Sequence, residues 1–154
     1  MMNESPCRIL LIEDSLADIC LFRLALTETS LNCELIVLHD GGEALDFVHR
    51  RGKYVDAARP DLVILDLLLP KNSGIEVLEA IRATGDMRTV PAVVMTSVAS
   101  PHDLARAEAL GIASRITKPC DFKEFLKIGA VLKDLIVGLQ RSSRSGGKSK
   151  ASAS

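Results

Sequence analysis

The chain has 154 residues, of which 47% are hydrophobic and 25% are charged, with a formal net charge of −1. This balance is typical of one globular domain with a real core and leaves little room for a second domain. Near-neutral charge argues against nucleic-acid binding as the main activity, because proteins that bind the phosphate backbone usually carry a clustered basic excess.

The four cysteines lie far apart and form no Cys-x-x-Cys pair, so neither a zinc site nor a disulfide framework is indicated. The N-terminus has no long apolar segment, and no stretch approaches the roughly 20 apolar residues of a transmembrane helix. We therefore expect a cytoplasmic protein with reduced thiols and no membrane or nucleic-acid partner.

Strands and helices alternate along the chain. We predict strands at 9–12, 34–38, 62–65, 92–95 and 114–116, of which the first, third and fourth are continuous apolar runs typical of parallel strands buried on both faces. The predicted helices are one capped by Ser15 that reaches about Thr29, one that follows Gly41-Gly42 and runs through Arg51, and three more from about Gly74 to Ala83, from Pro101 to Leu110 and from Asp121 to about Gln140. This order predicts an α/β fold, a doubly wound five-stranded parallel sheet with five helices and right-handed crossovers.

Two segments fall outside these elements. Residues 51–60 are predicted to form a surface loop. Residues 141–154 are rich in Ser, Gly and Lys and lack large apolar side chains, which predicts a disordered tail after a domain spanning 7–140.

Polar side chains follow four of the predicted strands. They are Glu13-Asp14 after the first strand, Asp66 after the third, Thr96 after the fourth and Lys118 after the fifth. An isolated acidic pair most often caps the following helix, but ligands of open α/β sheets bind beyond the carboxyl ends of the strands, where these residues should converge. The set suits phosphoryl transfer to a carboxylate: Asp66 as nucleophile, Mg²⁺ held by Asp14 and Asp66, Lys118 as a second positive charge, and Thr96 as a hydrogen-bond donor.

In this order on these strands, the acid pair, Asp66-Leu67-Leu68-Leu69-Pro70, Thr96-Ser97 and Lys118-Pro119 resemble the receiver domain of two-component response regulators. The resemblance covers about Cys7 to Gln140 and implies a flavodoxin-like sheet of order 2-1-3-4-5. It also implies a stand-alone response regulator that accepts a phosphoryl group from a sensor histidine kinase and signals by phosphorylation-dependent protein interaction. Such a protein catalyses only its own phosphorylation and dephosphorylation.

The resemblance also assigns roles to residues. Asp66 is the phosphoacceptor, Lys118 and Thr96 assist, and Mg²⁺ is held by Glu13, Asp14, Asp66 and the backbone carbonyl of Leu68. The Lys118-Pro119 bond is expected to be cis. Three stretches further resemble regulators encoded with phytochrome histidine kinases, which makes a bacteriophytochrome the expected kinase: Asp40-Gly41-Gly42-Glu43-Ala44-Leu45, Arg59-Pro60-Asp61-Leu62 and Pro70-Lys71-Asn72-Ser73-Gly74.

Two features bear on how this chain would switch and on how long it would stay phosphorylated. Arg115 stands three positions before Lys118, where receiver domains commonly have an aromatic residue. We hypothesise that Arg115 moves between solvent and an acidic partner surface as Thr96 shifts toward the phosphoryl group. The alternative is an exposed arginine with no switching role. Leu68 and Val98 are both apolar and cannot orient water near Asp66, which predicts a long-lived phosphorylated state.

The last predicted helix has more apolar residues than one face needs. A heptad-like stripe is formed by Phe125, Ile128, Leu132, Leu135 and Leu139, and further apolar groups are Leu126, Val131, Ile136 and Val137. A helix that is apolar on more than one face is usually buried on more than one face. This favours either a homodimer through this helix or deep burial within one chain.

Two other functions fit the sequence less well. A metal-dependent phosphatase would be expected to carry Asp-x-Asp after the first strand, whereas the chain has Glu13-Asp14-Ser15-Leu16 there. A phosphorylation-independent binding module of the same fold would not need the complete acceptor set. We expect output through a partner, by relay to a downstream phosphotransfer protein, by regulation of its own kinase or by action as a phosphate sink.

Overall fold

The computed structural model describes residues 6–71, 73–97 and 100–153, with side chains described as far as residue 141. The strands are β1 (Cys7–Ile12), β2 (Cys33–Leu38), β3 (Leu62–Asp66), β4 (Ala92–Thr96) and β5 (Ser114–Thr117). The helices are α1 (Leu16–Glu28), α2 (Gly41–Val48), α3 (Gly74–Ala83), α4 (Pro101–Ala109) and α5 (Phe122–Ala153), with 3₁₀ turns η1 (Gly52–Tyr54) and η2 (Gly85–Thr89). None of the helices in the described residues is long and apolar enough to cross a membrane.

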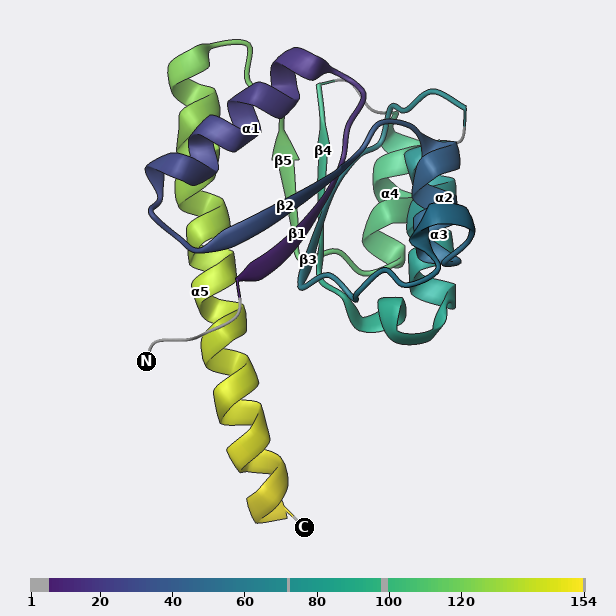
Figure 1. Cartoon of the computed structure of the whole chain (residues 1–154). Helices are drawn as coiled ribbons and strands as arrows, with labels where there is room; N and C mark the ends of the chain where they lie inside the picture. Colours follow the sequence, from purple (N-terminus) through teal and green to yellow (C-terminus); the bar gives the residue numbers. More distant parts are fainter. Residues whose placement is uncertain (1–5, 72, 98–99, 154) are drawn as a thin grey trace.

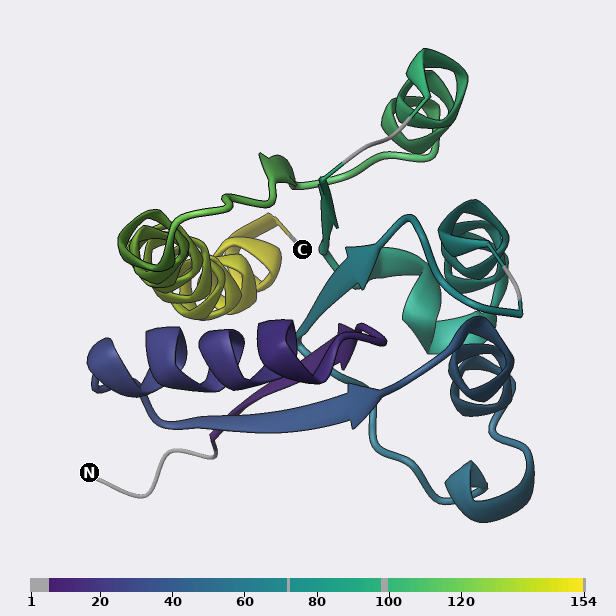
Figure 2. The ribbon, with the colours of Figure 1, turned by 90° about the horizontal axis from the view of Figure 1, so that it is seen from above.

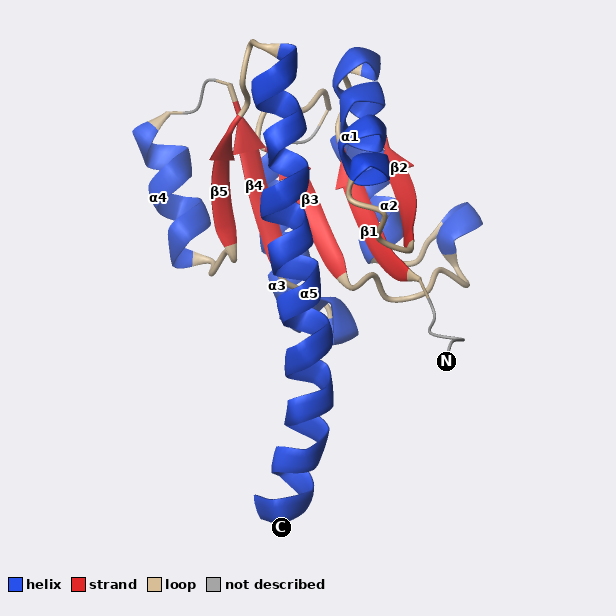
Figure 3. Ribbon diagram, turned by 90° about the vertical axis from the view of Figure 1, so that its left-hand side faces the viewer, coloured by secondary structure: helices blue, strands red, loops and turns tan. Residues whose placement is uncertain are grey.

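The five strands form one parallel sheet of order β2-β1-β3-β4-β5. Helices α1 and α5 cover one face, and α2, α3 and α4 cover the other (Figures 1 and 2). The predicted doubly wound fold and its strand order are confirmed. All strands end at the same edge of the sheet, and α5 extends past the opposite edge (Figure 3).

The core consists of two apolar layers, one on each face of the sheet. Along β1, Ile9 and Leu11 point into the layer under α1 and α5, whereas Leu10 and Ile12 point into the layer under α2 and α3. All five residues of β3 and all five of β4 are buried. This explains why the central strands are continuous apolar runs, since residues of both parities need a dry environment.

Helix α2 ends earlier than the sequence indicates. It was predicted to continue through Arg51, but it ends at Val48, and Arg50 adopts a left-handed conformation with φ 51°. Gly52 follows with φ 60° and begins η1. The predicted surface loop at 51–60 therefore contains a short 3₁₀ turn.

The buried stripe of α5 differs in phase from the predicted heptad. The fully buried side chains are Phe125, Ile128, Leu132 and Ile136, whereas Leu135 and Leu139 are only partly buried. The buried residues are spaced by three, four and four positions, which follows the 3.6 residues per turn of a straight helix, whereas the predicted stripe followed a 3.5-residue repeat. Phe125 packs edge-on against Phe22 of α1, with ring centroids 5.2 Å apart.

The backbone of α5 continues to Ala153, whereas composition predicts a disordered tail from residue 141. Extending an existing helix adds one hydrogen bond for each residue fixed, so continuation does not require apolar contacts. The boundary between the domain at 7–140 and a tail at 141–154 stays a prediction.

Close packing of α1 against α5 depends on Gly129. A Cβ atom there would lie 2.6 Å from the backbone oxygen of Ala25, so Gly129→Ala is expected to lower the free energy of unfolding by about 1–3 kcal/mol. A Cβ atom at Gly138 of the same helix would meet no heavy atom within 4 Å, so Gly138→Ala should raise stability by about 0.5–1 kcal/mol. Urea denaturation of both variants checks this pair, and a loss of similar size for both would contradict it.

Candidate functional site

The residues predicted to form the site lie where four strands end. Glu13 follows β1, Asp66 ends β3, Thr96 ends β4 and Lys118 follows β5. Backbone hydrogen bonds extend the sheet to the first and last of them: Glu13 N donates to Leu38 O at 2.9 Å, and Lys118 N donates to Thr96 O at 3.0 Å. The positions of these four residues are therefore set by strand pairing.

The ammonium of Lys118 lies among three carboxylates. Its Nζ atom is 2.6 Å from Glu13 Oε1, 2.8 Å from Asp66 Oδ2 and 2.8 Å from Asp18 Oδ2. Asp18 was missed by the sequence analysis because it is 100 residues from Lys118 and lies within α1. The only local signal was its position as an acidic residue in the first turn of α1, three residues after the N-cap Ser15.

Burial and mutual hydrogen bonds shift the pKa values of Glu13 and Lys118. Glu13 is 1% exposed and the side chain of Lys118 is 11% exposed. Burial raises the pKa of Glu13, against the opposing hydrogen bonds from Lys118 and Ser15 N. Burial alone would lower the pKa of Lys118, but hydrogen bonds to Asp18, Asp66 and Glu13 raise it, so the lysine is a fixed positive charge.

Three carboxylates form a group that suits a divalent cation. One oxygen from each of Glu13, Asp14 and Asp66 lies within 4.8 Å of the other two, and we call these residues the acidic cluster. Mg²⁺ takes oxygen ligands at about 2.0–2.1 Å in octahedral geometry, so neighbouring ligands stand about 3 Å apart and the three carboxylates would have to draw closer together around the ion. The donor set of the acidic cluster therefore fits Mg²⁺ or a similar hard cation.

Asp66 is held by neighbours on the β3–α3 connection. It is 7% exposed, and its Oδ1 atom accepts a hydrogen bond from Leu68 N at 2.9 Å. Gly74, the first residue of α3, packs against this connection so closely that a Cβ atom would lie 2.7 Å from Asp66 O. The absence of a side chain at Gly74 therefore lets α3 begin close to Asp66, while metal binding by the Leu68 carbonyl stays a prediction.

The expected cis bond before Pro119 is wrong. The described residues contain no cis peptide bond, so Lys118-Pro119 is trans, and the lysine side chain reaches the acidic cluster from this backbone. The trans isomer before proline is favoured by about 0.5–1 kcal/mol, and from it the long, flexible lysine side chain reaches three carboxylates.

The two predicted switch residues lie in different environments. Thr96 is 6% exposed at the end of β4. Arg115 Nη1 lies 3.8 Å from Glu108 Oε2 with both side chains about half exposed, which is a weak surface pair. A switching role for either residue stays a prediction, and Val98 lies outside the described residues.

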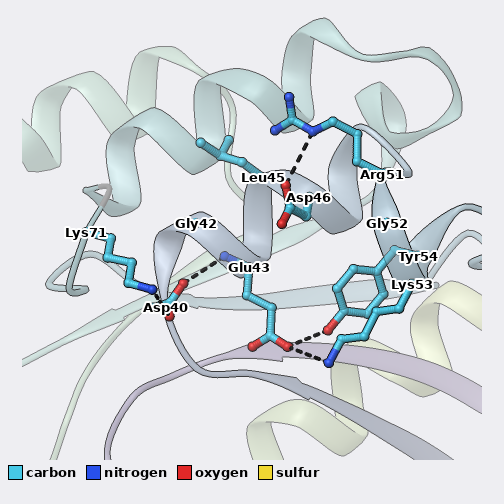
Figure 4. A pocket seen from close by; sticks show the side chains of 10 residues that line it. All are labelled: Asp40, Gly42, Glu43, Leu45, Asp46, Arg51, Gly52, Lys53, Tyr54 and Lys71. Carbon is cyan, nitrogen blue, oxygen red and sulfur yellow. Dashed lines mark hydrogen bonds and ion pairs between the residues drawn. The ribbon is translucent and has the colours of Figure 1, made fainter.

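A separate hollow of about 690 Å³ lies between the start of α2, η1 and Lys71 (Figure 4). Its carboxylates are paired within it: Asp40 with Lys71 at 3.4 Å, Asp46 with Arg51 at 3.3 Å, and Glu43 with both Lys53 and the Tyr54 hydroxyl. No residue of the acidic cluster lines this hollow. Its charged groups tie η1 and the β3–α3 connection to α2.

Glu43 should make stability depend on pH. Burial would raise the pKa of Glu43, but hydrogen bonds from Tyr54 and His39 N and the charge of Lys53 hold it below the ordinary value of 4.5. A depressed folded-state pKa stabilises the fold above pH 4.5, and this contribution is lost as pH falls through the folded-state value. The stability difference between wild type and Glu43→Gln, measured by urea denaturation, should therefore shrink below pH 4.5. A difference that is constant from pH 7 to pH 3.5 would contradict this account.

Known proteins resemble this chain in sequence and in fold. Residues 9–129 match the response regulator receiver domain family. Response regulator Rcp1 of Synechocystis is 38% identical over 130 residues, which cover 83% of this chain and 88% of that protein.

Two solved structures are similar over most of their length. The phosphorylated cyanobacterial phytochrome response regulator RcpA has a TM-score of 0.79 and 32% identity, covering 84% of this chain and 93% of that one. The Mn²⁺-bound form of Rcp1 has a TM-score of 0.75 and 37% identity, covering 80% and 89%.

Proposed function

We propose, from the premise that the chain belongs to the response regulator receiver domain family, that it accepts a phosphoryl group on Asp66 from a histidine kinase. The observation that carries this proposal is the environment of Asp66. A nearly buried carboxylate that contacts an ammonium at 2.8 Å and belongs to a cation-binding cluster is suited to become an acyl phosphate.

In the proposed phosphoryl transfer, each residue of the site has its own role. A carboxylate oxygen of Asp66 bonds to phosphorus while the phosphorus–nitrogen bond of the kinase phosphohistidine breaks, and the imidazole takes the bonding electron pair. Glu13, Asp14 and Asp66 would hold Mg²⁺, which when bound neutralises phosphoryl oxygens. Lys118 supplies a further positive charge, and Thr96 donates a hydrogen bond to the product.

Phosphotransfer from a kinase tests this function. A radiolabelled, autophosphorylated phytochrome histidine kinase should transfer label to the wild-type chain with Mg²⁺ and lose the transfer with Asp66→Asn or with chelator. Asp56→Asn changes an exposed loop carboxylate outside the site and is the matched control. Label on Asp66→Asn equal to that on wild type would refute Asp66 as the acceptor.

The kinase is proposed to dock beside the acidic cluster. Leu16 is 71% exposed at the start of α1, and Phe122 is 51% exposed at the start of α5. These helices lie side by side (Figure 2). Both residues lie shortly after the ends of β1 and β5, at the edge of the sheet that holds Asp66, so a partner that reaches Asp66 would cover them. The name of the similar structure RcpA, a cyanobacterial phytochrome response regulator, supports a phytochrome-type kinase as that partner.

A long phosphorylated lifetime is proposed from Leu68. Its side chain is 53% exposed beside Asp66 and has no polar atom that could orient an attacking water. Leu68→Asn should shorten the half-life of the phosphorylated protein several-fold, measured by its decay after the kinase is removed. An unchanged half-life would reject this explanation.

Output is proposed to pass through protein contacts, including a second copy of the chain through α5 and a downstream phosphotransfer protein. Val131 of α5 is 43% exposed and lies outside the buried stripe that covers the sheet. Sedimentation velocity should show a dimer that Val131→Asp weakens. A monomer before and after phosphorylation would exclude the homodimer.

A further inference from the structure

The Lys118 ammonium has as many carboxylate neighbours as N–H donors. An ammonium has three donors. Glu13 lies 2.6 Å away, and Asp18 and Asp66 each lie 2.8 Å away. Lys118 therefore has no donor left for another group unless one of these contacts changes.

Two of the three neighbours would change their contacts during the proposed reaction. Glu13 and Asp66 belong to the acidic cluster, so a bound cation competes with Lys118 for both of them, and Asp66 also loses charge at the oxygen that bonds to phosphorus. Among the described residues, Asp18 falls outside the acidic cluster. The contact between Asp18 and Lys118 can therefore persist when the cation binds and when Asp66 is phosphorylated.

Asp18 is itself held firmly. Its backbone N donates to the Ser15 hydroxyl at 3.2 Å in the first turn of α1. The adjacent turn is anchored in the core by Ile19 and Phe22, which are 5% and 1% exposed. A carboxylate is also favoured near a helix N-terminus. The Asp18 side chain is 24% exposed, so it sits at the border between the site and solvent.

We infer that Asp18 is a positioning residue that holds the Lys118 ammonium in place while Glu13 and Asp66 exchange partners during phosphoryl transfer. This inference rests on the proposed function, since it assigns Asp18 a role in the same reaction. With Asp18 present, Lys118 keeps one fixed contact on the α1 side and directs its other donors toward Asp66. Without Asp18, the flexible four-carbon chain has no contact that survives cation binding.

The test measures phosphorylation by acetyl phosphate at saturating Mg²⁺, determined separately for each variant. Asp18→Asn should react about tenfold more slowly, because charge-assisted hydrogen bonds fix the geometry of a reacting group. Asp18→Glu should recover much of the rate. Glu28→Gln, an exposed carboxylate at the other end of α1, should react like wild type.

A second readout follows Lys118 directly. The ¹⁵N signal of its ammonium, assigned with Lys118→Arg, should be visible in wild type and broadened by solvent exchange in Asp18→Asn, in both cases with Mg²⁺. Unchanged or faster phosphorylation of Asp18→Asn, or an unchanged Lys118 signal, would overturn the inference. Failure of wild type itself to become phosphorylated would instead reject the proposed function.

Discussion

Gly74→Ala is expected to lower the free energy of unfolding by about 2–3 kcal/mol and to slow phosphorylation of Asp66. A Cβ atom at position 74 would lie 2.5 Å from Leu67 Cα and 2.7 Å from Asp66 O, and both are backbone atoms that cannot rotate away. Relief requires the end of β3 or the start of α3 to move. Because Asp66 is the last residue of β3, either movement displaces its carboxylate from Lys118.

Urea denaturation and the rate of modification by acetyl phosphate measure the two effects. Gly138→Ala is the control, since its new methyl group meets open space in α5. If Gly74→Ala were as stable and as reactive as wild type, the close approach of α3 to β3 would not position Asp66.

Lys118→Met is expected to destabilise the protein by about 3 kcal/mol without divalent cations, because removing one partner leaves buried carboxylate charge uncompensated. Glu13 is 1% exposed and Asp66 is 7% exposed, so water can replace little of the lost charge. Methionine keeps most of the side-chain volume, which limits any effect of a cavity.

Mg²⁺ should restore more stability to Lys118→Met than it adds to wild type. In wild type the cation competes with the ammonium for Glu13 and Asp66, whereas in the variant it meets no competitor. Denaturation with chelator and with Mg²⁺ measures both gains. Lys127→Met, in an exposed pair with Glu124, should show little change in either condition. A smaller Mg²⁺ gain for Lys118→Met than for wild type would contradict a shared site.

Features set by local sequence were predicted well. The central strands are short apolar runs bounded by polar residues, and their burial on both faces follows from parallel pairing. Ser15 accepts a hydrogen bond from Asp18 N as the N-cap of α1, and α3 spans the predicted Gly74–Ala83. The convergence of Glu13, Asp66 and Lys118 follows from strand order once the doubly wound fold is known.

Features set by distant contacts were not predicted. The pairing of Asp18 with Lys118 spans 100 residues and depends on where α1 begins relative to the end of β5. Ile136 is buried because the stripe of α5 that covers the sheet follows the period of a straight helix. The sequence alone does not show which stripe of the helix faces the sheet. The trans bond at Lys118-Pro119 is the isomer that local sequence favours, and the wrong expectation of a cis bond came from the family resemblance.

The central claim is that Asp66 forms an acyl phosphate in a cation-dependent reaction, and intact-mass spectrometry after incubation with acetyl phosphate tests it most directly. With Mg²⁺, wild type and Asp56→Asn should each gain one phosphoryl group per chain, and fragmentation should place it on Asp66. Asp66→Asn, or wild type with chelator, should gain none. An adduct on another residue, or no adduct on wild type with saturating Mg²⁺, would contradict the account.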